Sequence, residues 1–339
     1  MSEGPGGMRI GITLPTEPFQ NRDMIDLVRR ADALGYHEVW SLESYTTEAF
    51  SPLAAVAMLS ERMRLGTAIV PVFTRPPALI AMSAMTVQEL SGGRLVLGLG
   101  ISSPQIIGQW MGVPFQRPLA RVRDTVAAVR AALSGEKVTY QGKTLAVNGF
   151  RLDIERTTAP PPIFLAVQGS KMCRLAGEIA DGLITNYITP EALPRMLEHV
   201  AEGARAAGRA APREVVCRIL TIVDEDPERL SSAMRRHMTP YVITPGYNRF
   251  FAEIGFEREA EQALAAWTSG DRKKATEAIS DRMINSIYLL GSAEYCRERL
   301  QAFAAAGVTS VALWFVSLAR TREERQAKIR TAIEKLAPR

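Results

Sequence analysis

The chain has 339 residues, of which 47% are hydrophobic and 23% charged, with 25 glycines and 20 prolines. This composition is typical of a globular protein and excludes a disordered, collagen-like or disulfide-scaffold chain. Lysine and arginine outnumber aspartate and glutamate by 41 to 36, which gives a net charge of +5. The charges are not gathered into a basic stripe, so nucleic acid is not an expected partner.

The positions of the cysteines, histidines and apolar runs exclude further classes of protein. The three cysteines lie far apart with no C-x-x-C, and the histidines are equally scattered, so no metal site is expected. His199 and His237 fall in helical stretches, where an exposed histidine is the ordinary interpretation. No apolar run approaches the ~20 residues of a membrane span, and residues 1–7 lack the features of a signal peptide. We expect a flexible leader over 1–7 and a cytoplasmic protein without a membrane partner.

Eight short apolar runs alternate with amphipathic helical stretches. Among the expected helices, one is capped by Asn21 and closed by Gly35, and another begins with Ser51 as its cap and Pro52 after it. Further helices are expected over about 77–90, 118–133 and 170–180. Eight strands, nearly all followed by helices, predict an α/β protein, a (β/α)8 TIM barrel forming a single domain over 8–339. A doubly wound sheet is the alternative. The strand runs cover residues 8–14, 38–41, 65–70, 94–98, 163–167, 183–186, 215–223 and 310–315.

Two stretches interrupt this repeat. Residues 136–150 predict an inserted hairpin, with Gln141-Gly142 at its turn. Residues 227–290 predict a helical insertion, whose first helix would be capped by Asp224 or Asp226. The aromatic and methionine-rich part of this insertion contains HMTPYVITPGYNRFF, which has too many turn residues for one continuous helix. We expect it to form a lid that covers a pocket and selects the substrate.

A barrel places its chemistry at the carboxyl ends of its strands. Glu43 and Asp224 are the carboxylates expected there, and a pair of carboxylates would serve a glycoside hydrolase. A plain helix cap is the more ordinary interpretation of Asp224. A serine triad is disfavoured because the sequence contains no G-x-S-x-G and no histidine at a strand end.

Glycines follow two of the predicted strands. Gly98-Leu99-Gly100 would let a planar ligand or a phosphate approach the backbone, although a simple strand-to-helix turn is the better interpretation of a lone G-x-G. The run from Val167 to Lys171 joins a strand to a helix. Free N–H groups at that helix start, a glycine and a nearby lysine predict a seat for an anion, although a plain capped helix explains the run equally well.

Several segments in unbroken order from about Leu34 to Leu300 resemble the luciferase-like monooxygenase superfamily. The resemblance is closest to its branch that uses the deazaflavin coenzyme F420. It independently implies a (β/α)8 barrel with insertions. The segments are LGYHEVWSLES, RLGTAIVPVFTRPP, ELSGGRLVLGLG, LSGEKVTYQGKTLAV, PPIFLAVQGSKMCRLAGEIADGLI and GSAEYCRERL.

The resemblance implies where the cofactor would bind. A flavin-like ring would rest against the third strand, over a cis peptide bond between Ala68 and Ile69, and Gly100 of the G-x-G run is added to the cofactor-binding candidates. Residues that line the ring and the ribityl chain would be Glu43, Pro71, Ile101 and Ser102. The cofactor phosphate would be surrounded by Gln168, Gly169, Lys171 and Met172. Candidates for the anionic polyglutamate tail are Lys171, Arg174 and Arg75.

One departure from the family pattern concerns catalysis. Many deazaflavin-dependent relatives carry Asp-His or Glu-His after the second strand, where the histidine can move a proton, whereas this chain has Glu43-Ser44. Glu43 would act as an acid or base if burial raises its pKa, or would only hydrogen-bond the ring.

The resemblance implies an F420-dependent oxidoreductase that transfers hydride between the deazaflavin and a small organic substrate. An apolar cup would surround the reacting atoms. Two alternatives stay open, namely an FMN-dependent two-component monooxygenase fed by a flavin reductase, and a non-catalytic protein that binds the cofactor. A homodimer, and an F420 reductase as an indirect redox partner, are family-level expectations. The cup would consist of Leu14, Ile69, Ile101, Trp314 and Phe315.

Overall fold

The structure is a computed structural model that describes residues 7–14, 22–44 and 47–338. The leader over residues 1–6 and the helix cap expected at Asn21 lie outside the described residues. None of the described helices is both long and apolar enough to cross a membrane.

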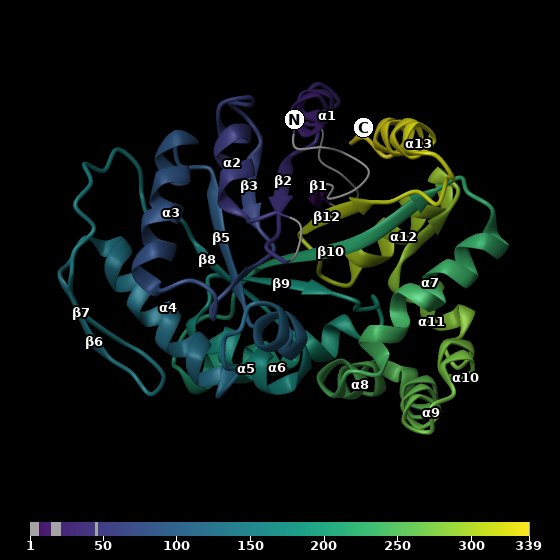
Figure 1. Cartoon of the computed structure of the whole chain (residues 1–339). Helices are drawn as coiled ribbons and strands as arrows, with labels where there is room; N and C mark the ends of the chain where they lie inside the picture. The colour runs from purple at the N-terminus through teal and green to yellow at the C-terminus, as the bar shows by residue number, and fades with distance from the viewer. Residues whose placement is uncertain (1–6, 15–21, 45–46, 339) are drawn as a thin grey trace.

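In the described part of the chain, eight parallel strands close into a barrel (Figure 1). Each strand pairs with its neighbour in parallel register, and β12 pairs with β1 to complete the circle. All eight correspond to the runs predicted from the sequence, which confirms the barrel. In order around the circle they are β1 (Arg9–Thr13), β2 (Glu38–Ser41), β3 (Arg64–Thr67), β5 (Leu95–Gly100), β8 (Ile163–Ala166), β9 (Gly182–Asn186), β10 (Glu214–Val223) and β12 (Ser310–Phe315).

Large side chains fill the inside of the barrel. Six strands each contribute one residue to a buried apolar cluster, and Ala68 and Ile69 pack against it from above. Gly66 leaves room for the ring of Trp40, because a Cβ atom at Gly66 would lie 2.2 Å from that ring. The interior is therefore packed and not an open pore. The six residues of the buried apolar cluster are Trp40, Val96, Phe164, Ile184, Val216 and Ala312.

Helices cover the outside of the barrel and bury a second, larger apolar core against the strands. The helix predicted to begin at Ser51 begins at Phe50, and Ser51 is not its cap. Instead the carboxylate of Glu48 accepts hydrogen bonds from the backbone N–H groups of Phe50 and Ser51, so an acidic side chain replaces the hydroxyl. The covering helices are α1 (Asp23–Ala33), α2 (Phe50–Ala57), α3 (Pro77–Leu90), α4 (Pro118–Ser134), α5 (Gly169–Ile179), α6 (Leu193–Ala206), α12 (Ala293–Ala305) and α13 (Arg322–Lys335).

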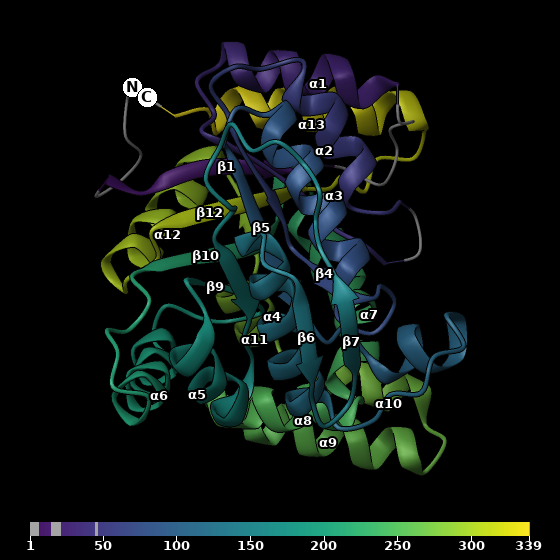
Figure 2. The ribbon, with the colours of Figure 1, turned by 90° about the vertical axis from the view of Figure 1, so that its left-hand side faces the viewer.

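The predicted hairpin is present as β6 (Val138–Gln141) and β7 (Ala146–Phe150). Asp124 on α4 holds it in place, because its carboxylate accepts hydrogen bonds from Tyr140 Oη at 3.0 Å and from the backbone N–H of Thr144 at 2.6 Å. The hairpin thus lies along the outside of α4 (Figure 2).

The predicted helical insertion consists of several helices separated by breaks. Asp226, one of the two expected caps, caps the first of them by accepting from the N–H of Glu228 at 3.0 Å. The HMTPYVITPGYNRFF segment is broken between Val242 and Pro245, which fits its turn residues. A three-residue strand, β11 (Leu289–Gly291), extends the sheet beside β10 and was not predicted. The helices are α7 (Pro227–Val242), α8 (Pro245–Phe251), the π-helix Ala252–Phe256, α9 (Glu257–Thr268), α10 (Arg272–Glu277) and α11 (Asp281–Ile287).

At the amino-terminal end of the barrel, buried charges tie four strands together. Glu38 is fully buried and accepts hydrogen bonds from Arg9 Nε at 2.6 Å and from Trp40 Nε1 at 2.9 Å. Glu214 binds the guanidinium groups of both Arg9 and Arg64. The strands β1, β2, β3 and β10 are therefore cross-linked by ion pairs below the inner apolar cluster.

This network predicts a loss of stability in acid. Burial alone would raise the pKa of Glu214, but hydrogen bonds and charges from Arg64 and Arg9 hold it below its ordinary value of 4.5. The unfolded chain therefore binds this proton more readily, so the free energy of unfolding decreases as the pH falls from about 4.5 through the folded-state pKa. Urea unfolding at a series of pH values tests this. Glu214→Gln should make the free energy of unfolding depend less on pH. An unchanged pH dependence in this variant would contradict the role of Glu214.

Candidate active site

Backbone conformation marks the carboxyl ends of three barrel strands. Ser102 after β5, Tyr187 after β9 and Asp224 after β10 have φ values of 59°, 55° and 54°. A positive φ is costly for a residue with a side chain, and such residues cluster at functional sites. The end of the barrel where a site is expected is thus also where the backbone is least regular.

The junction between β3 and β5 carries the predicted cis peptide bond. The bond Ala68–Ile69 is cis, as the family resemblance implied. Gly66 pairs with Val96 and Val70 with Leu99, so that residues 67–69 face only residues 97–98 across the ladder. This is a bulge, which turns the chain at the mouth of the barrel.

The candidate ring-binding residues surround this bulge. A Cβ atom at Gly100 would lie 3.0 Å from both Ile69 Cγ1 and Ala166 Cβ, so the backbone of β5 approaches its neighbours closely here. Ala68, Ile69, Ile101 and Ser102 are all half-buried, whereas Pro71 is buried in the short strand β4 (Val70–Pro71). The structure therefore brings Ala68, Ile69, Gly100, Ile101 and Ser102 to one edge of the barrel mouth.

Glu43 stands at the same edge, but its carboxylate is already occupied. Arg75 Nε lies 3.2 and 2.9 Å from the two carboxylate oxygen atoms, and Arg75 Nη2 lies 2.7 Å from one of them. Thr74 Oγ1 donates a further hydrogen bond at 3.2 Å. Arg75 also binds Glu48 at 2.8 Å. Glu43 thus anchors the segment that precedes α3, and Arg75 is engaged by carboxylates of the chain itself.

The predicted anion seat lies at the start of α5. Gly169 has a φ of 64°, and a Cβ atom there would have no atom within 4 Å, so the space in front of the helix start is open. No side chain caps the helix, since Gln168 Nε2 donates instead to Asn186 Oδ1 at 2.6 Å. Lys171 is exposed beside this opening. Unfilled N–H groups and a lysine are thus available to an anion.

Two other residues predicted near this seat point elsewhere. The side chain of Met172 is buried in the core between α5 and the barrel, so only its backbone N–H lies at the helix start. Arg174 Nε binds Glu202 on α6 at 2.7 Å. Among the predicted residues, Gln168, Gly169 and Lys171 therefore remain at the open helix start.

The helical insertion packs onto the strand ends through tyrosines. The ring of Tyr187 lies 4.9 Å from Tyr241 on α7, 6.0 Å from Tyr247 on α8 and 6.1 Å from Tyr288. Burial raises the pKa of Tyr247 to about 12, and burial also raises the pKa values of Tyr187 and Tyr288 well above their ordinary value. These phenols keep their protons throughout the physiological range, so they are neutral hydrogen-bonding groups.

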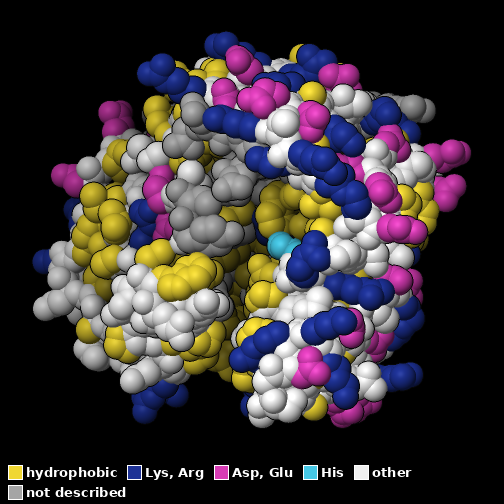
Figure 3. Space-filling model, turned by 45° about the vertical axis from the view of Figure 1, so that its right-hand side comes forward, with side chains coloured by type: hydrophobic (Ala, Val, Ile, Leu, Met, Phe, Trp, Pro, Cys, Tyr) yellow, Lys and Arg dark blue, Asp and Glu magenta, His cyan; other side chains and the backbone are white. Residues whose placement is uncertain are grey.

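Side chains of β10 and of the insertion both contact the end of β12. Arg218 Cζ lies 4.3 Å from the ring of Trp314, and His237 on α7 lies 5.8 Å from the same ring. Figure 3 shows hydrophobic side chains around a deep hollow on this side of the molecule, with a histidine at its edge. Of the predicted apolar cup, Ile69, Ile101 and Trp314 are half-buried at the mouth, whereas Leu14 and Phe315 are buried.

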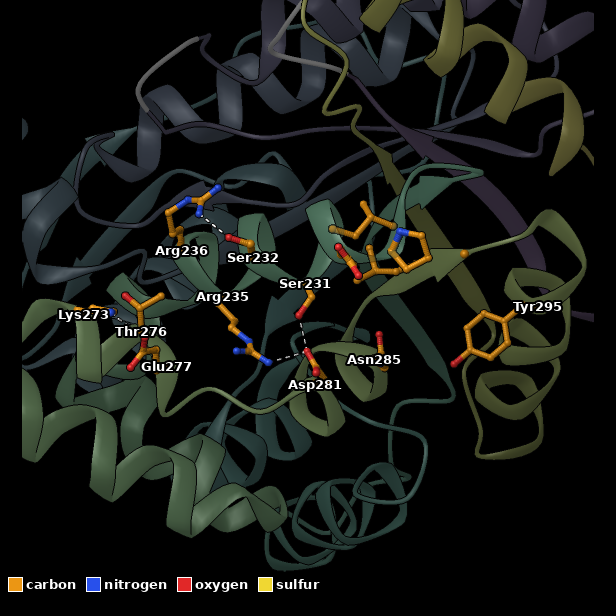
Figure 4. Close-up of a pocket in the computed structure, with 15 residues that line it drawn as sticks. Ser231, Ser232, Arg235, Arg236, Lys273, Thr276, Glu277, Asp281, Asn285 and Tyr295 are labelled. Atoms are coloured by element: carbon orange, nitrogen blue, oxygen red, sulfur yellow. Dashed lines mark hydrogen bonds and ion pairs between the residues drawn. The ribbon is translucent and has the colours of Figure 1, made fainter.

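A separate groove of about 1010 Å³ lies between α7, α10 and α11 (Figure 4). Its three cations are matched by three carboxylates, and Arg235 and Ser231 both bind Asp281. None of the predicted site residues lines it, and its balanced charge does not favour an anionic cofactor.

The second candidate carboxylate is engaged by the chain itself. Asp224 forms an ion pair with Lys335 on α13 at 2.7 Å. Among the described residues, no group of three His, Cys, Asp or Glu side chains is arranged to hold a metal ion.

Comparison with known proteins fits this geometry. The family model for luciferase-like monooxygenases matches residues 8–310. The chain belongs to this family. A Mycobacterium tuberculosis protein named as a coenzyme F420-dependent oxidoreductase is 28% identical, over 94% of this chain and 98% of the relative. The 5,10-methylenetetrahydromethanopterin reductase of Methanolobus tindarius is 28% identical, over 90% of this chain and 93% of the relative.

The fold is shared with a solved structure as well. The coenzyme F420-dependent tetrahydromethanopterin reductase of Methanopyrus kandleri superposes with a TM-score of 0.77 at 22% identity, covering 97% of both chains. These relatives confirm the resemblance predicted from the sequence segments, and the chain is an oxidoreductase of this family.

The environment of one histidine differs from the sequence expectation. His237, expected to be an ordinary exposed helical histidine, is half-buried against Tyr241, Tyr288 and Trp314. The signal was its position three residues after Met234 and four before Tyr241, which places it on the apolar face of its helix.

Proposed function

We propose that the chain is an F420-dependent oxidoreductase that transfers hydride between the deazaflavin and a small organic substrate. The open, uncapped start of α5 beside Gly169 carries the proposal, because it offers backbone donors to a phosphate at the rim of the barrel mouth. The names of the relatives add that F420 is the cofactor used by similar chains.

The residues at the mouth fit such a cofactor. Gln168, Gly169, Lys171 and the backbone of Met172 would hold the phosphate. Ala68, Ile69, Gly100, Ile101 and Ser102, with Pro71 behind them, would support the ring and the ribityl chain. The cofactor supplies the hydride chemistry when it is bound, and the chain orients its ring and excludes water. Glu43, held by Arg75, would fix the edge of the ring site without transferring a proton.

Gly169→Ala tests the phosphate seat, with Gly208→Ala as the matched control. The two glycines have φ values of 64° and 65°, and an added methyl group would meet open space at either position. Both substitutions therefore carry the same backbone cost of about 1–2 kcal/mol. Only the methyl group at Gly169 would stand where the phosphate binds. We expect both variants to lose similar thermal stability, but only Gly169→Ala to weaken F420 binding, by about tenfold (roughly 1.4 kcal/mol).

Fluorescence titration with F420 and with FMN measures this and separates the alternatives. Tighter binding of FMN and oxygen-dependent product formation would establish the two-component monooxygenase in place of our proposal. Binding of F420 without turnover of any substrate would favour the non-catalytic protein. Equal F420 affinities of the Gly169 and Gly208 variants would remove the phosphate seat.

We also propose that the protein is a homodimer that covers the outer face of α2 and α3. Four large apolar side chains are exposed on these neighbouring helices or directly after them, and Met58, the residue after α2, is exposed by 71%. Exposed large apolar side chains on neighbouring elements are typical of an interface. Light scattering should give twice the chain mass, and Met82→Asp should give a monomer. A monomeric native protein would contradict the proposal. The other three exposed apolar side chains on this face are Leu79, Met82 and Leu90.

A further inference from the structure

Three neighbouring strands carry a layer of polar and aromatic side chains directly above the inner apolar cluster. Each of β9, β10 and β12 contributes one residue to that cluster. Because side chains alternate between the two faces of a strand, the residue two positions further along also points into the barrel. These residues form the floor of the barrel mouth on this side. They are Asn186 on β9, Arg218 on β10 and Trp314 on β12, above Ile184, Val216 and Ala312.

Arg218 brings a permanent positive charge to this floor. It pairs across the sheet with Asn186 on one side and with Ala312 on the other, and it is half-buried. Its Cζ atom lies 4.3 Å from the centre of the Trp314 ring. This contact with the ring restricts the side chain, while the N–H groups of a guanidinium lie in its own plane. The charge therefore has a defined position inside the barrel.

A small cavity of about 10 Å³ opens at Arg218 and is also lined by Asn186, Trp314 and Tyr288. A cavity of this size admits about one water-sized group. The described residues that line it include one cation and no carboxylate. Asn186 Oδ1 accepts a hydrogen bond from Gln168 Nε2 at 2.6 Å, so Asn186 has its NH2 group to donate. The cavity thus offers hydrogen-bond donors and positive charge to a single oxygen atom.

Two titratable side chains within reach of the charge of Arg218 are neutral. Burial lowers the pKa of His237 to about 4, and the charge of Arg218 acts in the same direction. Burial raises the pKa of Tyr247 to about 12. Neither group therefore supplies negative charge at physiological pH. Since charges interact more strongly in a partly buried site than in water, the floor favours an anion over a neutral group of the same shape.

This floor lies opposite the candidate ring-binding residues. In the circle of eight strands, β10 is four strands away from β3, and β12 is four strands away from β5. Ala68 and Ile69 follow β3, and Gly100 ends β5. Arg218 and Trp314 therefore face those residues across the mouth. A small molecule between the two sides would have one end toward the ring site and the other toward Arg218.

We propose that Arg218 binds a carboxylate group of the substrate, so that the substrate is a carboxylic acid whose reacting carbon lies toward β3 and β5. This inference rests on the proposed function and names the class of its substrate. A planar carboxylate matches the planar guanidinium, and one of its oxygen atoms fits the cavity. A phosphate monoester places three oxygen atoms around one centre and fits this floor less well.

Benzoate and benzamide test the preference for a carboxylate on the native protein. The two compounds have nearly the same planar shape, but only benzoate is charged. Isothermal titration calorimetry of the full chain, with and without F420, should show that benzoate binds at least tenfold more tightly than benzamide. Phenyl phosphate should bind more weakly than benzoate. Equal affinities for benzoate and benzamide, tighter binding of phenyl phosphate, or no binding of benzoate would overturn the proposal.

Three variants locate the bound benzoate. Arg218→Met keeps the length of the side chain and should lower the benzoate affinity by about 10–100-fold, while the benzamide affinity stays within twofold. Arg272→Met is the matched control, because Arg272 Cζ lies 3.6 Å from the ring of Trp267 outside the mouth, and it should bind benzoate normally. Lys171→Met should also leave the benzoate affinity unchanged. A loss in Lys171→Met in place of Arg218→Met would put benzoate at the start of α5 and refute the assignment.

The same titrations separate this inference from the proposed cofactor. If benzoate binding depends on Arg218 but F420 does not bind, the proposed cofactor is wrong and the carboxylate site stands. If F420 binds and benzoate is not preferred over benzamide, the carboxylate site alone fails. Arg218→Met should change the F420 affinity by less than twofold, because the phosphate seat and the ring-binding residues belong to other strands.

Discussion

Replacing Glu38 by alanine is expected to lower the free energy of unfolding by about 3–5 kcal/mol. The carboxylate is fully buried and binds Arg9, Trp40 and the hydroxyl of Ser310. Its removal leaves Arg9 and Arg64 at the barrel end with Glu214 as their remaining carboxylate. Chemical unfolding monitored by circular dichroism measures the loss.

Two further variants identify the cause. Glu334→Ala removes a glutamate that pairs with Arg30 on the surface, where 41% of the Glu334 side chain is exposed, and should cost less than about 1 kcal/mol. Glu38→Gln keeps the shape of the side chain and part of its hydrogen bonding. Its loss in the free energy of unfolding should therefore lie between those of Glu38→Ala and Glu334→Ala. A loss at Glu38 no larger than that at Glu334 would show that the buried network does not hold the barrel together.

The barrel could be predicted because its signals are local. Each of the eight strands is a short apolar run, and the helices between them show their own periodicity. Elements without such a signal were missed. The strand β11 has only three residues, too few for any pattern, and exists because it pairs with Val223 and its neighbours on β10.

Caps were predictable only where the capping residue is the expected type. Asp226 caps α7 as its position before Pro227 indicates. Glu48 caps α2 through two backbone N–H groups, although a longer acidic side chain is a weaker signal than Ser51-Pro52. The local sequence therefore predicted the start of α2 to within one residue, but it predicted the wrong side chain as the acceptor for the first N–H groups of the helix.

The site was predictable in part for the same reason. Strand ends follow from strand assignments, so Gly100, Ile101 and Gly169 could be placed at the mouth from the sequence. The pairing of Glu43 with Arg75 spans 32 positions, and the approach of His237 to Trp314 spans 77. Helical periodicity shows that His237 lies on an apolar face, but not which surface that face covers.

Gly98→Ala is expected to be the most damaging single-methyl change at the site. A Cβ atom at Gly98 would lie 1.8 Å from the carbonyl oxygen of Thr67 and 2.4 Å from Ile184 Cδ1. Thr67 Oγ1 also exchanges two hydrogen bonds with the backbone of Gly98, each 2.8 Å long. The methyl group would force β5 away from β3 and break both bonds, at a cost of about 3 kcal/mol or more.

The same displacement would move the residues that support the cofactor ring, because Gly100 and Ile69 lie directly beyond this contact. F420 affinity should therefore fall by more than tenfold in any Gly98→Ala protein that folds. Gly246→Ala is the control, since a methyl group there meets no atom within 4 Å in the helix α8 and should add about 0.5–1 kcal/mol of stability. If Gly98→Ala keeps the native free energy of unfolding and the native F420 affinity, β3 and β5 tolerate separation. The close contact between these strands would then not determine the shape of the barrel mouth.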